Sequence, residues 1–159
     1  MGTVSRFNAA RRYIMDTSSL LSQKENEPHD RKTFVTMWLN IERLIKEQRI
    51  VVCSENVDEI HDEEISKWLS GLQCNVVEID DEVQRNVIKV VTTYPLLVDI
   101  HKNKSSADPF LIATALKYGL VVVSEEKKGS LKRIPDVCNG LGVDCVNINE
   151  LCAREQWQF

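Results

Sequence analysis

The sequence predicts an α/β fold in which helices cover both faces of a central, mostly parallel sheet, giving a three-layer α/β/α sandwich. Short apolar runs rich in β-branched residues alternate with longer stretches whose apolar residues recur at helical spacing. The chain of 159 residues has the size of one domain. Neither an internal repeat nor a linker divides it. We therefore expect a single domain over residues 1–159, with residues 1–11 as a flexible N-terminal tail.

Five short apolar runs have the character of strands. They lie at Tyr13–Met15, Ile50–Cys53, Asn75–Ile79, Leu120–Val123 and Asp144–Ile148. The fourth run is almost purely β-branched, as is typical of parallel strands that are buried on both faces. Right-handed crossovers place the loops after neighbouring parallel strands along one edge of the sheet. Residues that follow these runs are therefore candidates for a shared ligand site.

Between the predicted strands, apolar residues recur three and four positions apart, and capping or turn residues mark the ends of helices. The expected helices run over residues 32–48, from Ser54 as N-cap through Trp68, from a capping box at Asp81 and Gln84 to Pro95, from Ala107 to Gly119, over 135–141, and through Trp157 at the end. The three tryptophans, Trp38, Trp68 and Trp157, occupy core-compatible positions on these helices, where packing is commoner than stacking on bases.

Composition restricts the class of protein. The formal net charge of −4 disfavours nucleic-acid binding through a broadly basic surface. No apolar run has the length of a membrane span, and the N-terminal residues lack the apolar stretch of a signal peptide, so we expect a cytoplasmic protein with no membrane contact. The five cysteines form no C-x-x-C pair, which predicts reduced thiols. His29, His61 and His101 show no metal-ligand spacing, and we assign them no role.

Three acids are expected to meet at one edge of the sheet. Asp16 directly follows the first strand, Glu126 follows the strand at 120–123, and Asp108 opens the helix between them. The Asp108 carboxylate stands at the end of an apolar helical stripe instead of on a solvated face. Carboxylates gathered this closely repel one another unless a divalent cation neutralises them. An oxygen-only ligand set of this kind suits Mg²⁺ or Mn²⁺.

Four segments extend this interpretation: YIMDTSSLL, SENVDEI, ADPFLIATALKYG and VVVSEE. In this order they resemble the signature segments of PIN-domain nucleases. The chain is most similar to the uncharacterised DUF4411 branch, which the terminal CVNINELCAREQWQF also resembles. The resemblance implies a PIN-like fold and a site whose catalytic and metal-binding residues are Asp16, Glu59, Asp108 and Glu126. It further implies that Ser18 and Ser124 hold these carboxylates in place.

The sequence departs from the family pattern at two points. Many relatives carry Asp where Glu126 stands, which lengthens the side chain here and leaves Glu125 as the alternative fourth acid. The early helix offers several acids, and Glu59 is selected among them by the V-x-E-I pattern that the resemblance supplies. Glu59 lies off the apolar stripe of its helix.

The resemblance implies a metal-dependent endoribonuclease that hydrolyses RNA phosphodiester bonds to 5′-phosphate and 3′-hydroxyl ends. Many small stand-alone PIN proteins are toxins of prokaryotic toxin–antitoxin pairs, so an antitoxin and a second copy of the chain are the expected protein partners. Basic stretches at Arg11–Arg12, 102–104 and 127–133 flank the acids in sequence and are candidates for phosphate contacts. Two alternatives stay open: a PIN scaffold that binds RNA or protein without cleaving, and a DNA-directed, structure-specific nuclease.

Overall fold

The computed structural model describes residues 11–98, 107–127 and 133–159. At its centre is a five-stranded sheet of β1 (Tyr13–Met15), β2 (Ile50–Cys53), β3 (Asn75–Val77), β4 (Val121–Val123) and β5 (Cys145–Val146). The strand order is β3-β2-β1-β4-β5, and every pairing is parallel. β2 and β3 are added on one side of β1, and β4 and β5 are then added on its other side. The carboxyl ends of β1 and β4 therefore form the switch point at which such sheets bind ligands.

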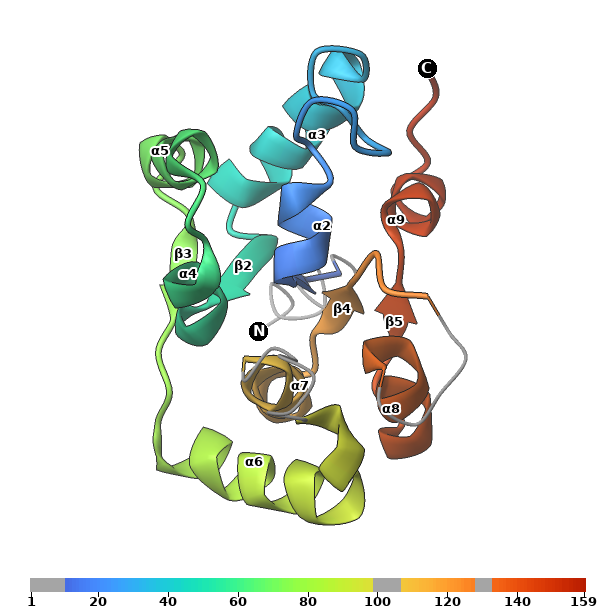
Figure 1. The fold of residues 1–159 in the computed structure, drawn as a ribbon. Coiled ribbons are helices and arrows are strands. Elements are labelled where there is room, and N and C mark those ends of the chain that lie inside the picture. Colours follow the sequence, from blue (N-terminus) through green and yellow to red (C-terminus); the bar gives the residue numbers. More distant parts are fainter. Residues whose placement is uncertain (1–10, 99–106, 128–132) are drawn as a thin grey trace, which may run out of the picture.

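Helices cover both faces of this sheet, which confirms the predicted α/β fold. They are α2 (Thr17–Leu21), α3 (Val35–Lys46), α4 (Ser54–Glu59), α5 (Glu63–Gly71), α6 (Asp81–Thr93), the 3₁₀ helix η1 (Pro95–Leu97), α7 (Asp108–Tyr118), α8 (Ile134–Leu141) and α9 (Ile148–Arg154). Figure 1 shows α3, α5 and α9 on one side of the sheet and α6, α7 and α8 on the other. None of the described helices combines the length and the apolar character that a membrane span requires. The predicted tail lies, apart from Arg11, outside the described residues.

Each central strand buries alternate residues in opposite layers. Tyr13 and Met15 pack with the apolar residues of α3, α5 and α9, whereas Ile14 between them packs with those of α6, α7 and α8. All three side chains are fully buried. This period of two is the geometry of a strand that is covered on both faces. The tryptophans pack in the first layer as predicted, and Trp38 meets Trp68 edge to face at 5.8 Å. The last helix does not reach Trp157 as predicted, because α9 ends at Arg154.

The helix predicted to continue from Ser54 to Trp68 is wrong, because the chain forms two helices there. α4 ends at Glu59, and Ile60 adopts an extended conformation. The Asp62 carboxylate then accepts a hydrogen bond from the Ile65 amide at 3.0 Å and caps α5. An aspartate that caps a new helix competes with continuation of the old one. Ser54 is the first helical residue of α4, not its N-cap.

The caps of two other helices also differ from the expected positions. The predicted capping box at Asp81 and Gln84 is wrong, because Asp80 is the N-cap of α6 and accepts from a main-chain amide in the first turn. A capping box forms instead at α9, where Asn147 and Glu150 exchange side-chain to main-chain hydrogen bonds. Asp80 and Asp81 are neighbouring residues of the same type and equally suited to cap a helix, so the sequence alone does not select between them.

A set of polar contacts fastens the residues after α9 to the start of β1. The Tyr13 hydroxyl donates to Glu155 at 2.6 Å, and the Arg49 guanidinium donates to both Glu155 oxygens at 2.9 and 2.7 Å. Burial acts to raise the pKa of Glu155, but the hydrogen bonds from Arg49 and Tyr13 outweigh burial and lower it. The ionised carboxylate therefore stabilises the folded chain.

We expect the Glu155→Gln substitution to lower the free energy of unfolding at neutral pH by about 1.5–3 kcal/mol, the range for charged hydrogen bonds. Because the pKa of Glu155 is lowered on folding, its contribution is present above the unfolded-state pKa and is lost as pH falls through the folded-state pKa. Urea unfolding at decreasing pH should show the two proteins converging. The matched Glu47→Gln change in the exposed pair with Arg43 should cost less than about 0.5 kcal/mol. Equal losses in both variants would contradict this account.

Candidate functional site

Asp16 directly follows β1 and caps α2 at the switch point of the sheet. Its carboxylate accepts hydrogen bonds from the Ser19 amide, the Ser18 hydroxyl and the Ser124 hydroxyl, each at 2.8 Å. Asp16 is 2% exposed. Burial raises its pKa to about 6, and the hydrogen bonds from Ser19, Ser124 and Ser18 oppose this rise only in part. A buried carboxylate with a raised pKa is a feature that marks functional sites, because a bound cation relieves its desolvation.

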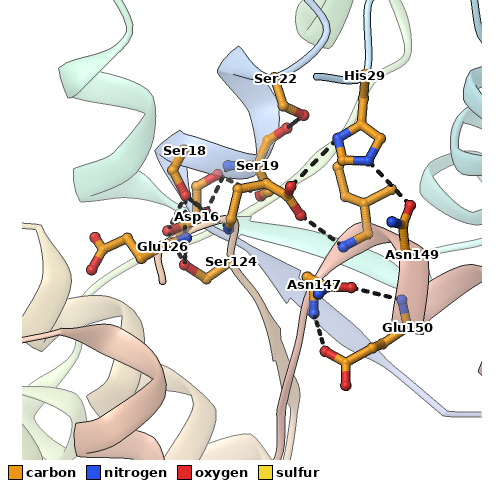
Figure 2. A network of polar contacts seen from close by, with 12 residues as sticks. Asp16, Ser18, Ser19, Ser22, His29, Ser124, Glu126, Asn147, Asn149 and Glu150 are labelled. Carbon is orange, nitrogen blue, oxygen red and sulfur yellow. Dashed lines mark hydrogen bonds and ion pairs between the residues drawn. The ribbon is translucent and has the colours of Figure 1, made fainter. Parts of the chain in front are cut away.

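Ser18 and Ser124 join the end of β1 to the end of β4. The Ser18 hydroxyl, which donates to Asp16, accepts from the Glu125 amide at 3.0 Å, and the Ser124 hydroxyl accepts from the Glu126 amide at 3.1 Å. The two hydroxyl oxygens lie 3.5 Å apart. Figure 2 shows Asp16 between the two serines. The structure thus brings both predicted serines to Asp16, where each contacts the carboxylate and the backbone after β4.

Asp108 is the first residue of α7 and is 4% exposed. The helix that it opens ends at Gly119, whose φ of 65° lies in the left-handed region, as predicted for this glycine. A hydrogen bond with Cys145 and burial raise the pKa of the Cys138 thiol on α8, and the negative charges of Asp16 and Asp108 raise it further. Because α7 leads through Gly119 into β4, Asp108 at the start of α7 lies toward the carboxyl edge of the sheet.

Glu59, the last residue of α4, is linked to the first site residue through Thr17. The Thr17 hydroxyl donates to Glu59 Oε2 at 2.9 Å and accepts from Asn56 Nδ2 at 2.9 Å. Asn56 is fully buried. Neither Thr17 nor Asn56 was predicted as a site residue. The available signals were the position of Thr17 directly after Asp16 and the position of Asn56 one helical turn before Glu59.

The two acids after β4 have different neighbours. Glu125 Oε2 accepts from the Ile148 amide at the start of α9 at 2.8 Å, and Glu125 Oε1 lies 3.4 Å from His29 Nδ1. Glu126 Oε1 accepts from the Ile134 amide at the start of α8 at 3.1 Å. Each carboxylate thus meets the N-terminus of a helix, where negative charge is favoured. Because both Glu125 oxygens are engaged with α9 and the α2–α3 loop, Glu126 is the candidate for the fourth acid.

The acids do not form a closed group of metal ligands. Over the part of the chain that the structure describes, no cluster of three or more His, Cys, Asp or Glu side chains is arranged to hold a metal ion. Asp16 follows β1, Asp108 opens α7, and Glu59 is hydrogen-bonded to Thr17, the residue after Asp16. Mg²⁺ is commonly bound through only one or two carboxylates, with waters completing its coordination. Two buried carboxylates at one sheet edge fit a hard divalent cation of this kind.

Arg11 and Arg12, which flank the acids in sequence, do not lie beside the acidic edge in the structure. Both residues precede β1, and the Arg12 carbonyl accepts from the Val121 amide at the start of β4 at 3.0 Å. They therefore lie at the amino edge of the parallel sheet, whereas Asp16 lies at its carboxyl edge. Proximity in sequence misleads here because a strand of three residues separates the two edges.

The other two basic stretches are only partly described. Residues 102–104 and 128–132 lie outside the described residues, so their predicted phosphate contacts stay predictions. Lys127 and Arg133 are described, and they stand between β4 and α8 on the side of the sheet where Glu126 lies.

Comparison with known proteins identifies a family and a fold. A family model described as "Domain of unknown function (DUF4411)" matches residues 13–159. No curated protein matches the chain. Among solved structures, FitAcB from Neisseria gonorrhoeae is 17% identical with a TM-score of 0.54, and the match covers 86% of this chain and 97% of that chain.

Two further structures have the same arrangement. The structure of FitAB bound to the IR36 DNA fragment is 15% identical with a TM-score of 0.54, covering 86% of this chain and 94% of that chain. PAE2754 from Pyrobaculum aerophilum is 12% identical with a TM-score of 0.51, covering 93% of this chain and 98% of that chain. At these identities the likeness shows the fold alone, and that fold is PIN-like as the sequence segments predicted.

Proposed function

This chain belongs to the DUF4411 family, and on that premise we propose that it is a divalent-metal-dependent endoribonuclease that hydrolyses RNA phosphodiester bonds. One observation carries the proposal: the buried Asp16 carboxylate, with its raised pKa, sits at the switch point of a PIN-like sheet under three hydrogen-bond donors. Burial disfavours the charged form of this carboxylate, and a bound cation would offset that cost.

In this proposal Asp16 and Asp108 would hold Mg²⁺ or Mn²⁺, with Glu59 and Glu126 as further ligands, directly or through water. Such an ion supplies a lowered pKa for an attacking water and a positive charge against the scissile phosphate. The chain itself contributes by holding the Asp16 side chain in one orientation. The hydrogen bonds to Asp16 fix its carboxylate before substrate arrives, so that little reorientation is needed during the reaction.

The proposal extends to a biological role as the toxin of a prokaryotic toxin–antitoxin pair. Its support is the resemblance to small stand-alone PIN proteins and the fold shared with FitAB, which was solved on a DNA fragment. The net charge of −4 makes this chain a poor general binder of nucleic acid, so an RNA substrate would be engaged locally. A separate antitoxin that covers the acidic edge would then restrain cleavage.

The proposal predicts that removal of divalent metal abolishes cleavage of RNA. Purified protein would be incubated with 5′-labelled single-stranded RNA and with DNA of the same sequence, in Mg²⁺, in Mn²⁺ or in excess chelator. We expect RNA cleavage with either ion, none with chelator, and recovery when metal is restored. The fragments are expected to carry 5′-phosphate and 3′-hydroxyl ends.

Each other outcome favours a different function. Cleavage of DNA alone would replace the ribonuclease proposal with a DNA-directed nuclease. Binding of RNA without cleavage, by folded protein with saturating metal, would favour a PIN scaffold. Cleavage that persists in chelator would contradict the proposed role of the carboxylates.

A further inference from the structure

His29 lies in the loop between α2 and α3 and is 7% exposed, although its sequence position suggested no role. Its Nδ1 lies 3.4 Å from Glu125 Oε1, a contact longer than a good hydrogen bond, and its Nε2 lies 3.2 Å from Asn149 Oδ1. Its main-chain carbonyl accepts from Trp38 Nε1 at 2.6 Å. The ring is thus fixed between the core of α3 and the start of α9.

Glu125 connects this histidine to the candidate active site. One carboxylate oxygen faces His29 and the other accepts from the Ile148 amide, while the Glu125 amide donates to the Ser18 hydroxyl. That same hydroxyl donates to Asp16. Figure 2 shows the contacts as one continuous network from His29 to Asp16. Only the Glu125 residue and one serine separate the imidazole from the buried carboxylate.

Glu125 is held at two points, because its side chain contacts α9 and the α2–α3 loop while its main-chain amide donates to Ser18. The Glu125 side chain is 19% exposed, so it has solvent within reach if a protein partner is lost. The Ile148 amide holds one carboxylate oxygen toward α9, His29 lies against the other oxygen, and the amide of the same residue donates to Ser18. Without the imidazole, rotation of the carboxylate into water would release the backbone at this position.

We propose that His29 is a positioning residue, which by holding Glu125 keeps the backbone after β4, and with it Ser18 and Ser124, against Asp16. The expected effect of His29 on cleavage rests on the proposed ribonuclease function. Its expected effect on the hydrogen bonds around Asp16 is independent of that function. A purely structural role, by contrast, would fasten α9 to the α2–α3 loop and leave the surroundings of Asp16 unchanged.

The test compares two substitutions of the same residue. His29→Leu removes the ring nitrogen that lies 3.4 Å from Glu125 Oε1, whereas in His29→Asn the side-chain amide nitrogen can occupy the place of Nδ1. Amide hydrogen exchange followed by NMR reports the Ser19, Glu125 and Glu126 amides without any need for activity. Steady-state RNA cleavage with saturating Mg²⁺ reports kcat and KM separately. The matched control is His61→Leu, at an exposed histidine.

We expect His29→Leu to speed exchange of these three amides roughly tenfold and to lower kcat roughly 10- to 100-fold with KM within about twofold. His29→Asn should restore both quantities to within about threefold, and His61→Leu should match the wild type. Wild-type exchange in His29→Leu would overturn the proposal, as would equal impairment by the Asn and Leu variants. If His29→Leu does not fold, Glu125→Gln, which keeps an acceptor for the Ile148 amide, must show the faster exchange. If wild-type protein cleaves no RNA, the proposed function fails and the exchange rates alone decide this inference.

Discussion

The Asp16→Asn variant is expected to lose metal-dependent RNA cleavage by at least about 10²–10³-fold in kcat, the range seen when one preorganised electrostatic group is removed. Asparagine has nearly the same shape, and its carbonyl can still accept from the Ser19 amide. What it lacks is the charge that attracts a divalent cation. Asp108→Asn is expected to have an effect of similar size, because Asp108 is the other deeply buried carboxylate near this edge.

The assay for this prediction needs a control that changes charge without touching the site. Asp58→Asn serves this purpose, since Asp58 is an exposed acid on α4 next to the proposed ligand Glu59. Cleavage of labelled RNA by that variant should stay within about twofold of the wild type. Glu126→Gln should fall between the two extremes, because part of its carboxylate is engaged with α8. Full activity in either Asp16→Asn or Asp108→Asn would refute the assignment of the site.

The strands and the residues that follow them were predictable because their signals are local. A run such as Leu120–Val123 is too short and too β-branched for a helix, and parallel pairing then places Asp16 and Ser124 at one edge. Strand ends were predicted less well. β5 ends at Val146 because Asn147 caps α9. At the edge of the sheet, the hydrogen bonds of this cap are favoured over one more pair of hydrogen bonds between strands.

The missing parts of the site depend on tertiary contacts. α2 was not predicted, because TSSLL has little helix propensity and forms its turn through the Asp16 cap. The link from Thr17 to Glu59 joins residues 42 positions apart, so no local pattern contains it. Likewise His29 gains its significance only from Glu125, which packing of α9 brings to it. Sequence patterns identify acids at strand ends, but they do not say which neighbouring groups hold them.

The same Asp16→Asn variant is expected to be more stable than the wild type above neutral pH. Burial raises the pKa of Asp16 from 3.8 to about 6, and its hydrogen bonds with Ser19, Ser124 and Ser18 do not cancel the rise. A group whose pKa is raised on folding contributes stability below its unfolded-state pKa, and that stability is lost as pH rises through the folded-state pKa. At pH 8 the ionised carboxylate therefore costs on the order of 3 kcal/mol of folding free energy relative to a neutral side chain.

Urea unfolding in chelator, at several values of pH, measures this cost directly. The stability gain of Asp16→Asn should be largest near pH 8 and should vanish below about pH 4, where the wild-type carboxyl is also neutral. Asp62→Asn provides a control of opposite sign: the hydrogen bond from the Ile65 amide lowers the pKa of Asp62, so its charge is favourable in the folded state. Added Mg²⁺ should stabilise the wild type by mass action but leave Asp16→Asn unchanged. A variant that is less stable at pH 8, or one that Mg²⁺ stabilises equally, would mean that Asp16 is a structural cap. The expected result would instead mean that the chain tolerates an unfavourable charge in its core because the bound cation, not the fold, compensates it.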